Sequence, residues 1–310
     1  MTRAAWLLPY LWLMVLSRVA MAQQLEPRAY SPSPVGTNFV VVGFGEINGS
    51  VLFDPTLPIT DVTADLHTPL VGLGRTFGMF GQQGLVTAVL PYVWGSMQGM
   101  VLEQSRSITR SGLANLSVKL SYNLRGSPAM TPQEFARYGG RKVIVGTSVT
   151  IDAPTGQYDK TKLVNLGTNR WAFKPELGIS YPRKKWVYET YGGIWFFTEN
   201  SAFYPGTSTR RQDPLPTFQV HVSYTFRPRM WLAFDGTWYG GGATSINDAP
   251  PTTRLNNSRA GVTFAFPIRK GQSIKIAYSR GATARIGEKF SSLAVAWQFS
   301  WFDRPHSARP

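Results

Sequence analysis

The clearest pattern in the chain is a strict alternation of apolar and polar residues within 216–242. Every second residue from Phe218 to Phe226 is apolar or aromatic, and the residues between them are polar. Such period-two alternation predicts a β-strand with one apolar and one polar face. An Arg-Pro-Arg turn at 227–229 follows, and then the alternation restarts. Strands of about ten residues with aromatic ends are typical of transmembrane β-barrels, whose apolar face points outward to lipid.

The same alternation recurs along the chain and predicts an all-β fold, a transmembrane antiparallel barrel of about twelve strands over 37–302. The expected strands are 37–45, 62–77, 85–94, 115–124, 143–152, 171–181, 186–198, 216–226, 230–239, 257–266, 273–280 and 291–302. An even number brings both termini to the periplasmic side, as in single-chain bacterial outer-membrane barrels. Positions expected to face lipid include Val118, Val220, Phe264 and Ile276.

The lengths of the connections agree with this barrel. With a periplasmic N-terminus, odd connections should be long outer loops and even ones short turns. The odd connections are long, at 46–61, 95–111, 153–170, 199–215, 240–256 and 281–289. The even ones are short at 78–84, 182–185, 227–229 and 267–272, whereas 125–142 is long. That segment contains Thr131-Pro132-Gln133-Glu134, a capping box with proline at the first helical position, and predicts a short periplasmic helix near 131–138.

The two ends of the chain lie outside the barrel pattern. An apolar run from Ala4 to Leu16 follows Arg3 and ends before Ala20-Met21-Ala22, which predicts a secretory signal peptide over 1–22. Residues 23–36 form a proline-rich leader that cannot be a central strand. We expect this leader in the periplasm, with insertion into the barrel mouth as the alternative. Residues 303–310 would form a periplasmic tail.

The chain is strongly basic, with a formal net charge of +15. In a protein that stays inside the cell this charge would suggest nucleic acid, but export argues against such a partner. The charges cluster between the predicted strands, so they are either solvated loops or contacts to the phosphates of outer-membrane lipids and lipopolysaccharide.

Catalytic and cofactor chemistry find little support in the sequence. The chain has no cysteine, which excludes disulfides and thiolate metal sites. Its three histidines, His67, His221 and His306, show no spacing that pairs one with a serine, so we expect no enzyme. Acidic residues near the first loop lack a calcium-binding motif, and we predict no metal and no cofactor.

The polar faces of the strands would line the barrel interior. By alternation, the expected lumen-lining residues are Lys119, Lys174, Glu176, Glu189, His221, Asp235, Arg259 and Lys275. Barrels of about eight strands are filled by side chains, whereas those of about sixteen or more leave an open channel. Twelve strands lie between these sizes, so the inward residues either pair into a polar plug or line a narrow pore. If the turn at 227–229 is centred on Pro228, His221 and Asp235 face each other across two strands, close enough to interact.

Several longer segments carry a resemblance to a known family. They are LEPRAYSPSPVGTNFVVVGFG (25–45), VLFDPTLPITDV (51–62), NLRGSPAM (123–130), PTGQYD (154–159), KLVNLGTNRWAFKPELG (162–178), FFTEN (196–200) and RRQDPLP (210–216). In these segments the chain resembles the proteobacterial family named after the MetA pathway of phenol degradation.

The resemblance implies an outer-membrane barrel of a Gram-negative bacterium that passes small solutes passively, aromatic or hydrophobic compounds among them. It brings no catalytic or binding residues with it. The alternative is a plugged structural or interaction barrel without transport. Such barrels are inserted by the barrel-assembly machinery, whose signal is normally an aromatic C-terminus, whereas here eight residues follow Phe302.

Overall fold

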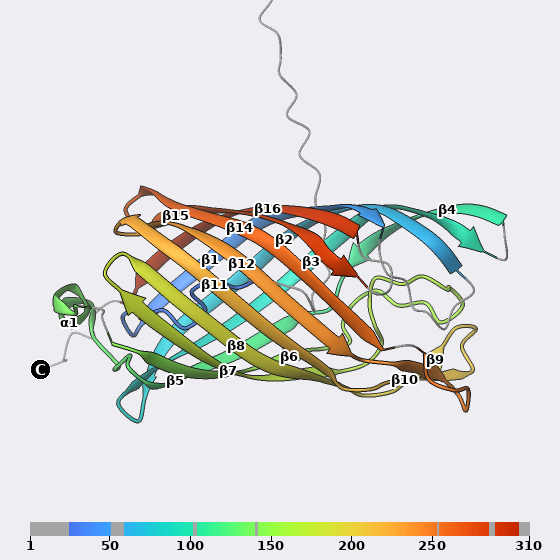
Figure 1. The fold of residues 1–310 in the computed structure, drawn as a ribbon, viewed down its shortest axis with the longest axis horizontal. Coiled ribbons are helices and arrows are strands. Elements are labelled where there is room, and N and C mark those ends of the chain that lie inside the picture. Colours follow the sequence, from blue (N-terminus) through green and yellow to red (C-terminus); the bar gives the residue numbers. More distant parts are fainter. Residues whose placement is uncertain are drawn as a thin grey trace, which may run out of the picture.

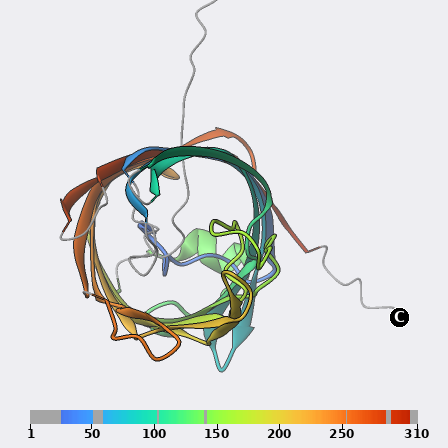
Figure 2. The ribbon, with the colours of Figure 1, turned by 90° about the vertical axis from the view of Figure 1, so that its right-hand side faces the viewer.

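The computed structural model describes residues 25–50, 59–101, 104–139, 142–252, 254–284 and 289–303. These residues form one elongated antiparallel barrel, shown from the side in Figure 1 and from the right-hand end of that view in Figure 2. Among them, no helix has both the length and the apolar character needed to cross a membrane.

The barrel wall is a single antiparallel sheet that closes on itself. Its strands are β1 (Thr37–Ser50), β2 (Ile59–Met79), β3 (Gln82–Val101), β4 (Gln104–Leu113), β5 (Ser117–Arg125), β6 (Ile144–Asp152), β7 (Ala172–Arg183), β8 (Trp186–Phe197), β11 (Leu215–Arg227), β12 (Met230–Gly241), β14 (Leu255–Arg269), β15 (Gln272–Ala284) and β16 (Lys289–Phe302). Strand β1 pairs with both β16 and β2, and β2 pairs with β3, which closes the ring. Strands β4 and β5 pair with different parts of β3 and share one place, so thirteen strands fill twelve places.

The predicted faces of the wall are confirmed. Large apolar side chains are exposed on the outside, such as Leu177 at 61% and Val220 at 45%. Their neighbours in sequence, Glu176 and Gln219, are buried on the inside. The apolar face is therefore the outer one, as a lipid environment requires.

The two ends of the barrel differ in their connections. One end, here called the short-turn end, has turns of two residues at 80–81, 184–185, 228–229 and 270–271. Lys184 and Arg229 adopt positive φ there, at 56° and 65°. The other end, the long-loop end, carries loop 153–171 and a separate three-stranded sheet of β9 (Asn200–Phe203), β10 (Ser208–Gln212) and β13 (Thr244–Ile246).

The structure corrects the expected extent of two outer loops. Most of 95–111 is strand, because β3 continues to Val101 and pairs with β4 through Tyr92–Leu113 to Val101–Gln104. Strand β1 likewise extends to Ser50, inside the expected loop 46–61. The residues of these extensions are polar or follow no regular pattern. They therefore lack the apolar alternation from which the membrane-spanning strands were predicted. Backbone pairing continues past the apolar band because the hairpin partners remain in register.

The predicted helix is present as α1 (Pro132–Arg137), at the short-turn end (Figure 1). The side chain of Thr131 accepts a hydrogen bond from the Glu134 backbone, and the Thr131 backbone N–H donates to Glu134 Oε2 at 2.7 Å. The capping box therefore forms as the sequence indicates.

Candidate functional site in the barrel lumen

The leader lies inside the barrel. Figure 2 shows it as the blue segment that crosses the interior of the ring. The Glu26 side chain bonds to Lys119 on β5, while the Glu26 backbone N–H donates to Gln219 Oε1 on β11 at 3.4 Å. Strands β5 and β11 are four places apart in the wall, so this residue bridges across the lumen. The expectation that the leader lies in the periplasm is therefore corrected for residues 25–36, and insertion, the alternative, is what the structure shows.

Tyr30 is the most deeply held residue of the leader, at 2% exposed. Its ring stands over Gly146 on β6 and Gly178 on β7, which are register partners. A Cβ atom on either glycine would lie within 2.1 and 2.3 Å, respectively, of a ring atom of Tyr30. Because glycine has no side chain, Gly146 and Gly178 leave room for the Tyr30 ring, and we call this site the seat of Tyr30.

Polar contacts fix the Tyr30 hydroxyl at the bottom of this seat. It donates to Glu176 Oε1 at 3.1 Å and shares a hydrogen bond of 3.1 Å with Ser148 Oγ. The ring also contacts Tyr191 edge-on, with centroids 5.2 Å apart. Burial and the neighbouring Glu176 carboxylate both raise the pKa of Tyr30, so the hydroxyl stays protonated and remains a donor.

An ion-pair cluster surrounds Glu26. Lys119 bonds to Glu26 and lies 3.5 Å from Glu176, which also pairs with Lys174 at 2.9 Å. Burial raises the pKa of the Glu26 carboxyl, but Lys119, Lys174 and Lys275 outweigh burial and lower the pKa to about 2. Glu26 is therefore a carboxylate at any ordinary pH, and the leader supplies a negative charge to a positive region of the wall.

Arg28 anchors the leader to a second group of wall residues. Its backbone N–H donates to Glu189 Oε2 at 2.8 Å, and its guanidinium donates to Ser223 Oγ at 3.0 Å and Thr225 Oγ1 at 2.6 Å. The guanidinium also lies 4.8 Å from the centre of the Trp231 ring, in cation–π contact. Arg28 thus attaches the leader to β8, β11 and β12 together.

His221 and Asp235 form a buried pair next to the leader. The predicted register is confirmed, because His221 faces Asp235 across β11 and β12. His221 Nδ1 lies 2.7 Å from Asp235 Oδ1, and Thr263 donates to Asp235 Oδ2 at 2.6 Å. On its other side His221 is the register partner of Glu189. The histidine therefore stands between two carboxylates on neighbouring strands.

The structure brings most of the predicted lumen residues together, and two stand apart. Lys119, Lys174 and Glu176 form the cluster around Glu26, while Glu189, His221 and Asp235 lie on three adjacent strands. Arg259 is buried elsewhere, over the Phe290 ring at 3.8 Å and bonded to Ser279 Oγ at 2.9 Å. Lys275 is on the same face of β15 as buried Ser279 and its side chain is exposed, so it makes no close contact with the cluster and acts on Glu26 only through its charge.

Sequence reasoning missed the contribution of the leader to this site. Glu26, Arg28 and Tyr30 alternate along a proline-rich segment that has no strand or helix pattern. The signal that could have found them is the tyrosine that follows two charged residues at alternate positions, because an extended solvated linker has no need to bury a tyrosine.

The histidines in the described part of the chain have carboxylates as partners. On the outer wall, His67 Nδ1 lies 3.4 Å from Glu46 Oε1, and its ring stacks on Trp94 at 5.4 Å. His221 pairs with Asp235 as above, and His306 lies outside the described residues. Among the residues described, no group of three or more histidine, aspartate or glutamate side chains could hold a metal ion.

A closed twelve-stranded wall, apolar outside and polar inside, defines the class to which this protein belongs: it is a transmembrane β-barrel of the kind found in the outer membranes of Gram-negative bacteria. The chain is a member of the family described as "Putative MetA-pathway of phenol degradation", whose model matches residues 56–299. The resemblance seen in the sequence is therefore confirmed.

Solved structures share this fold. The chain is similar to the COG4313 outer membrane channel from Pseudomonas putida F1, with a TM-score of 0.73 and 18% identity over 90% of this chain and 100% of that one. It is also similar to the β-domain of the Bordetella autotransporter BrkA, with a TM-score of 0.51 and 12% identity over 86% of this chain and 100% of that one. No curated protein matches the chain.

Proposed function

We propose that this barrel is a passive outer-membrane channel for small solutes and that leader residues 25–36 close its lumen. The observation that carries the proposal is that a separate chain segment, held by ion pairs and hydrogen bonds, lies in the lumen and joins strands that are four places apart in the wall. Twelve strands enclose more room than wall side chains alone fill. Displacing the leader would therefore leave a polar passage lined by Lys119, Glu176 and Glu189.

The orientation and the cargo belong to the same proposal. The short-turn end, with α1, faces the periplasm, and the long-loop end faces outward, as in other outer-membrane barrels. The family name links the chain to phenol degradation, which favours aromatic or hydrophobic compounds as cargo. Basic residues of the long-loop end, such as Lys160 and Arg254, would contact lipopolysaccharide phosphates, and the barrel-assembly machinery would insert the protein. The proposal includes no catalytic step.

The alternative is a barrel that the leader plugs permanently. The two differ in whether ions cross the lumen, so conductance of the purified protein in planar bilayers separates them. Gly178→Val fills the seat of Tyr30 and should displace the leader, because the added atoms would overlap the ring. Gly192→Val is the matched control, since a Cβ at Gly192 on β8 meets no atom within 4 Å.

We expect Gly178→Val and Tyr30→Ala to raise the conductance or the open probability several-fold over wild type and over Gly192→Val. Liposome uptake with a panel of aromatic and polar solutes then identifies the cargo. Absence of current from every variant would refute the channel. Equal current from all four proteins would show that the leader does not close it.

A further inference from the structure

Strand β4 has a strand neighbour on one side only. Strand β3 pairs with β5 over Gly84–Val89 and with β4 over Tyr92–Val101, and among the described strands none pairs with the opposite edge of β4. Loop 153–171 covers that edge instead. The Gln157 backbone N–H donates to the Leu113 carbonyl at 2.8 Å. At this point near the long-loop end, the wall is completed by a loop and not by a strand.

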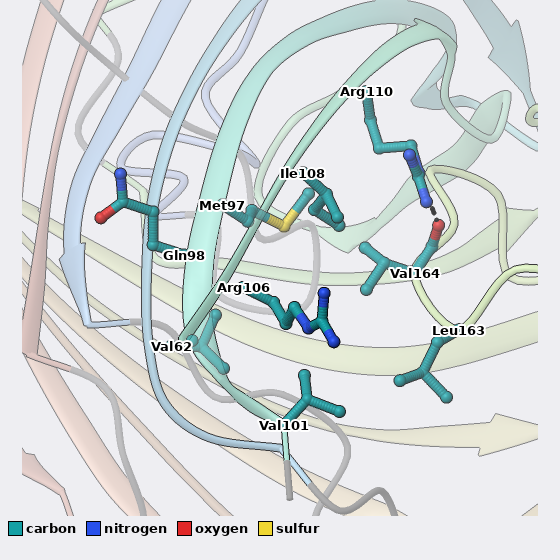
Figure 3. Close-up of a pocket in the computed structure, with 10 residues that line it drawn as sticks. Val62, Met97, Gln98, Val101, Arg106, Ile108, Arg110, Leu163 and Val164 are labelled. Carbon is teal, nitrogen blue, oxygen red and sulfur yellow. Dashed lines mark hydrogen bonds between the residues drawn. The ribbon is translucent and has the colours of Figure 1, made fainter. Parts of the chain in front are cut away.

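An apolar pocket lies between this loop and the inner face of the β3–β4 hairpin (Figure 3). Its cavity volume is about 100 Å³. The apolar side chains that line it are Val62, Met97, Val101, Ile108, Leu163 and Val164. An apolar cavity of roughly 150 Å³ in another protein holds a benzene molecule. The pocket has about two thirds of that volume and the same kind of lining, so it would hold a short aliphatic chain or most of a single ring.

Two arginines of β4 give the pocket a positive charge. Arg106 and Arg110 line it together with Ile108, because alternate residues of a strand share one face. Arg110 Nε donates to the Val164 carbonyl at 2.9 Å, and Arg106 Nη2 donates to Gln104 Oε1 at 2.7 Å. These acceptors are neutral, and within the described part of the chain no carboxylate is recorded in an ion pair with either arginine.

A guanidinium without a carboxylate partner beside an apolar cavity favours one kind of ligand. Arginine presents planar pairs of N–H donors that match the two oxygens of a carboxylate. The apolar lining would cover the hydrocarbon part of a ligand but has no hydrogen-bond partner for a second polar group on it. The pocket thus combines recognition of one negative charge with burial of one small apolar group.

We propose that this pocket binds a small apolar molecule carrying a single carboxylate, of the size of one aromatic ring. Its place near the long-loop end makes it a first binding site for cargo that enters from outside. That role as an entry site rests on the proposed channel function, whereas the binding itself does not.

The test uses the full mature protein in nanodiscs and measures dissociation constants by calorimetry, with empty nanodiscs as the blank. The probes are benzoate, benzyl alcohol, which has the ring without the charge, and acetate, which has the charge without the ring. We expect benzoate to bind at least about tenfold more tightly than either, because only benzoate uses both the cavity and the arginines.

Three variants locate the binding. Arg106→Gln should weaken benzoate by about tenfold or more and leave benzyl alcohol within about twofold. Ile108→Trp fills the cavity and should weaken both ring compounds. Arg211→Gln is the control, because this arginine pairs with Glu199 at 2.9 Å and does not line the pocket. Benzoate binding no tighter than benzyl alcohol, or unchanged by Arg106→Gln, overturns the proposal.

The same proteins separate this inference from the channel function. If Gly178→Val conducts and benzoate does not bind, the pocket proposal fails and the channel stands. If benzoate binds as expected and no variant conducts, the channel fails and the binding site stands.

Discussion

The outward face of β11 allows the strongest quantitative prediction. Its outward positions run from Pro216 to Phe226. At about 3.3 Å per residue and a tilt of about 40°, this span rises about 25 Å, the height of the apolar band of an outer-membrane barrel. Val220 is one residue from the centre of the span and is 45% exposed on the outside. An arginine there would stand near the bilayer midplane, where it costs about 2–4 kcal/mol.

We therefore expect Val220→Arg to lower the free energy of unfolding by about 2–4 kcal/mol. The measurement is equilibrium unfolding in lipid vesicles with denaturant, followed by tryptophan fluorescence. The matched control is Gln219→Arg, one residue away and facing inward. This substitution loses one long hydrogen bond from the Glu26 backbone N–H and directs the new cation into the polar interior of the barrel. We expect it to cost less than about 1.5 kcal/mol.

Val220→Leu serves as a second control, because it keeps the position apolar and should change stability by less than about 1 kcal/mol. Equal losses from the arginines at 219 and 220 would refute the assignment of faces. A larger loss from the inward substitution would indicate that the apolar face does not meet lipid.

Two further predictions concern topology and pH. A cysteine at Ser208 should be labelled by a membrane-impermeant reagent on intact cells and one at Lys184 should not; the reverse pattern would invert the barrel. Burial raises the pKa of Glu26 but the surrounding lysines lower it to about 2, so its ion pair is complete above about 4.5 and is lost only as pH falls towards about 2. Glu26 should then cause no pH step in the current between about pH 5 and 8, and a step there that disappears in Glu26→Gln would contradict this.

The parts of the site that the sequence could predict depend on short separations along the chain. His221 and Asp235 are fourteen residues apart, on two strands joined by a tight turn, so the position of the turn sets their pairing. The turn residues Pro228 and Arg229 are readable from their types, and so is the capping box of α1. Strict period-two alternation then assigns each side chain to the inner or the outer face.

The leader contacts could not be found in the same way. Arg28 and Glu189 are 161 residues apart, and no periodic pattern connects them. The seat of Tyr30 depends on two glycines that face each other only after β6 and β7 have paired. Glycines in a strand are equally compatible with a bend, so their types alone do not reveal the ring above them.

By itself, the sequence determined the barrel class, the number of places in its wall, the outward apolar face and the turns at the short-turn end, because each of these follows from residue types at neighbouring positions. The tertiary structure alone decided that the leader fills the lumen, that β3 and β4 extend beyond the apolar band, and that loop 153–171 completes the wall over the pocket. These features arise where segments distant in sequence meet after the ring has closed. The physical reason is that ion pairs, hydrogen bonds and the fit of a side chain depend on distances in space, which alternation along the chain does not encode.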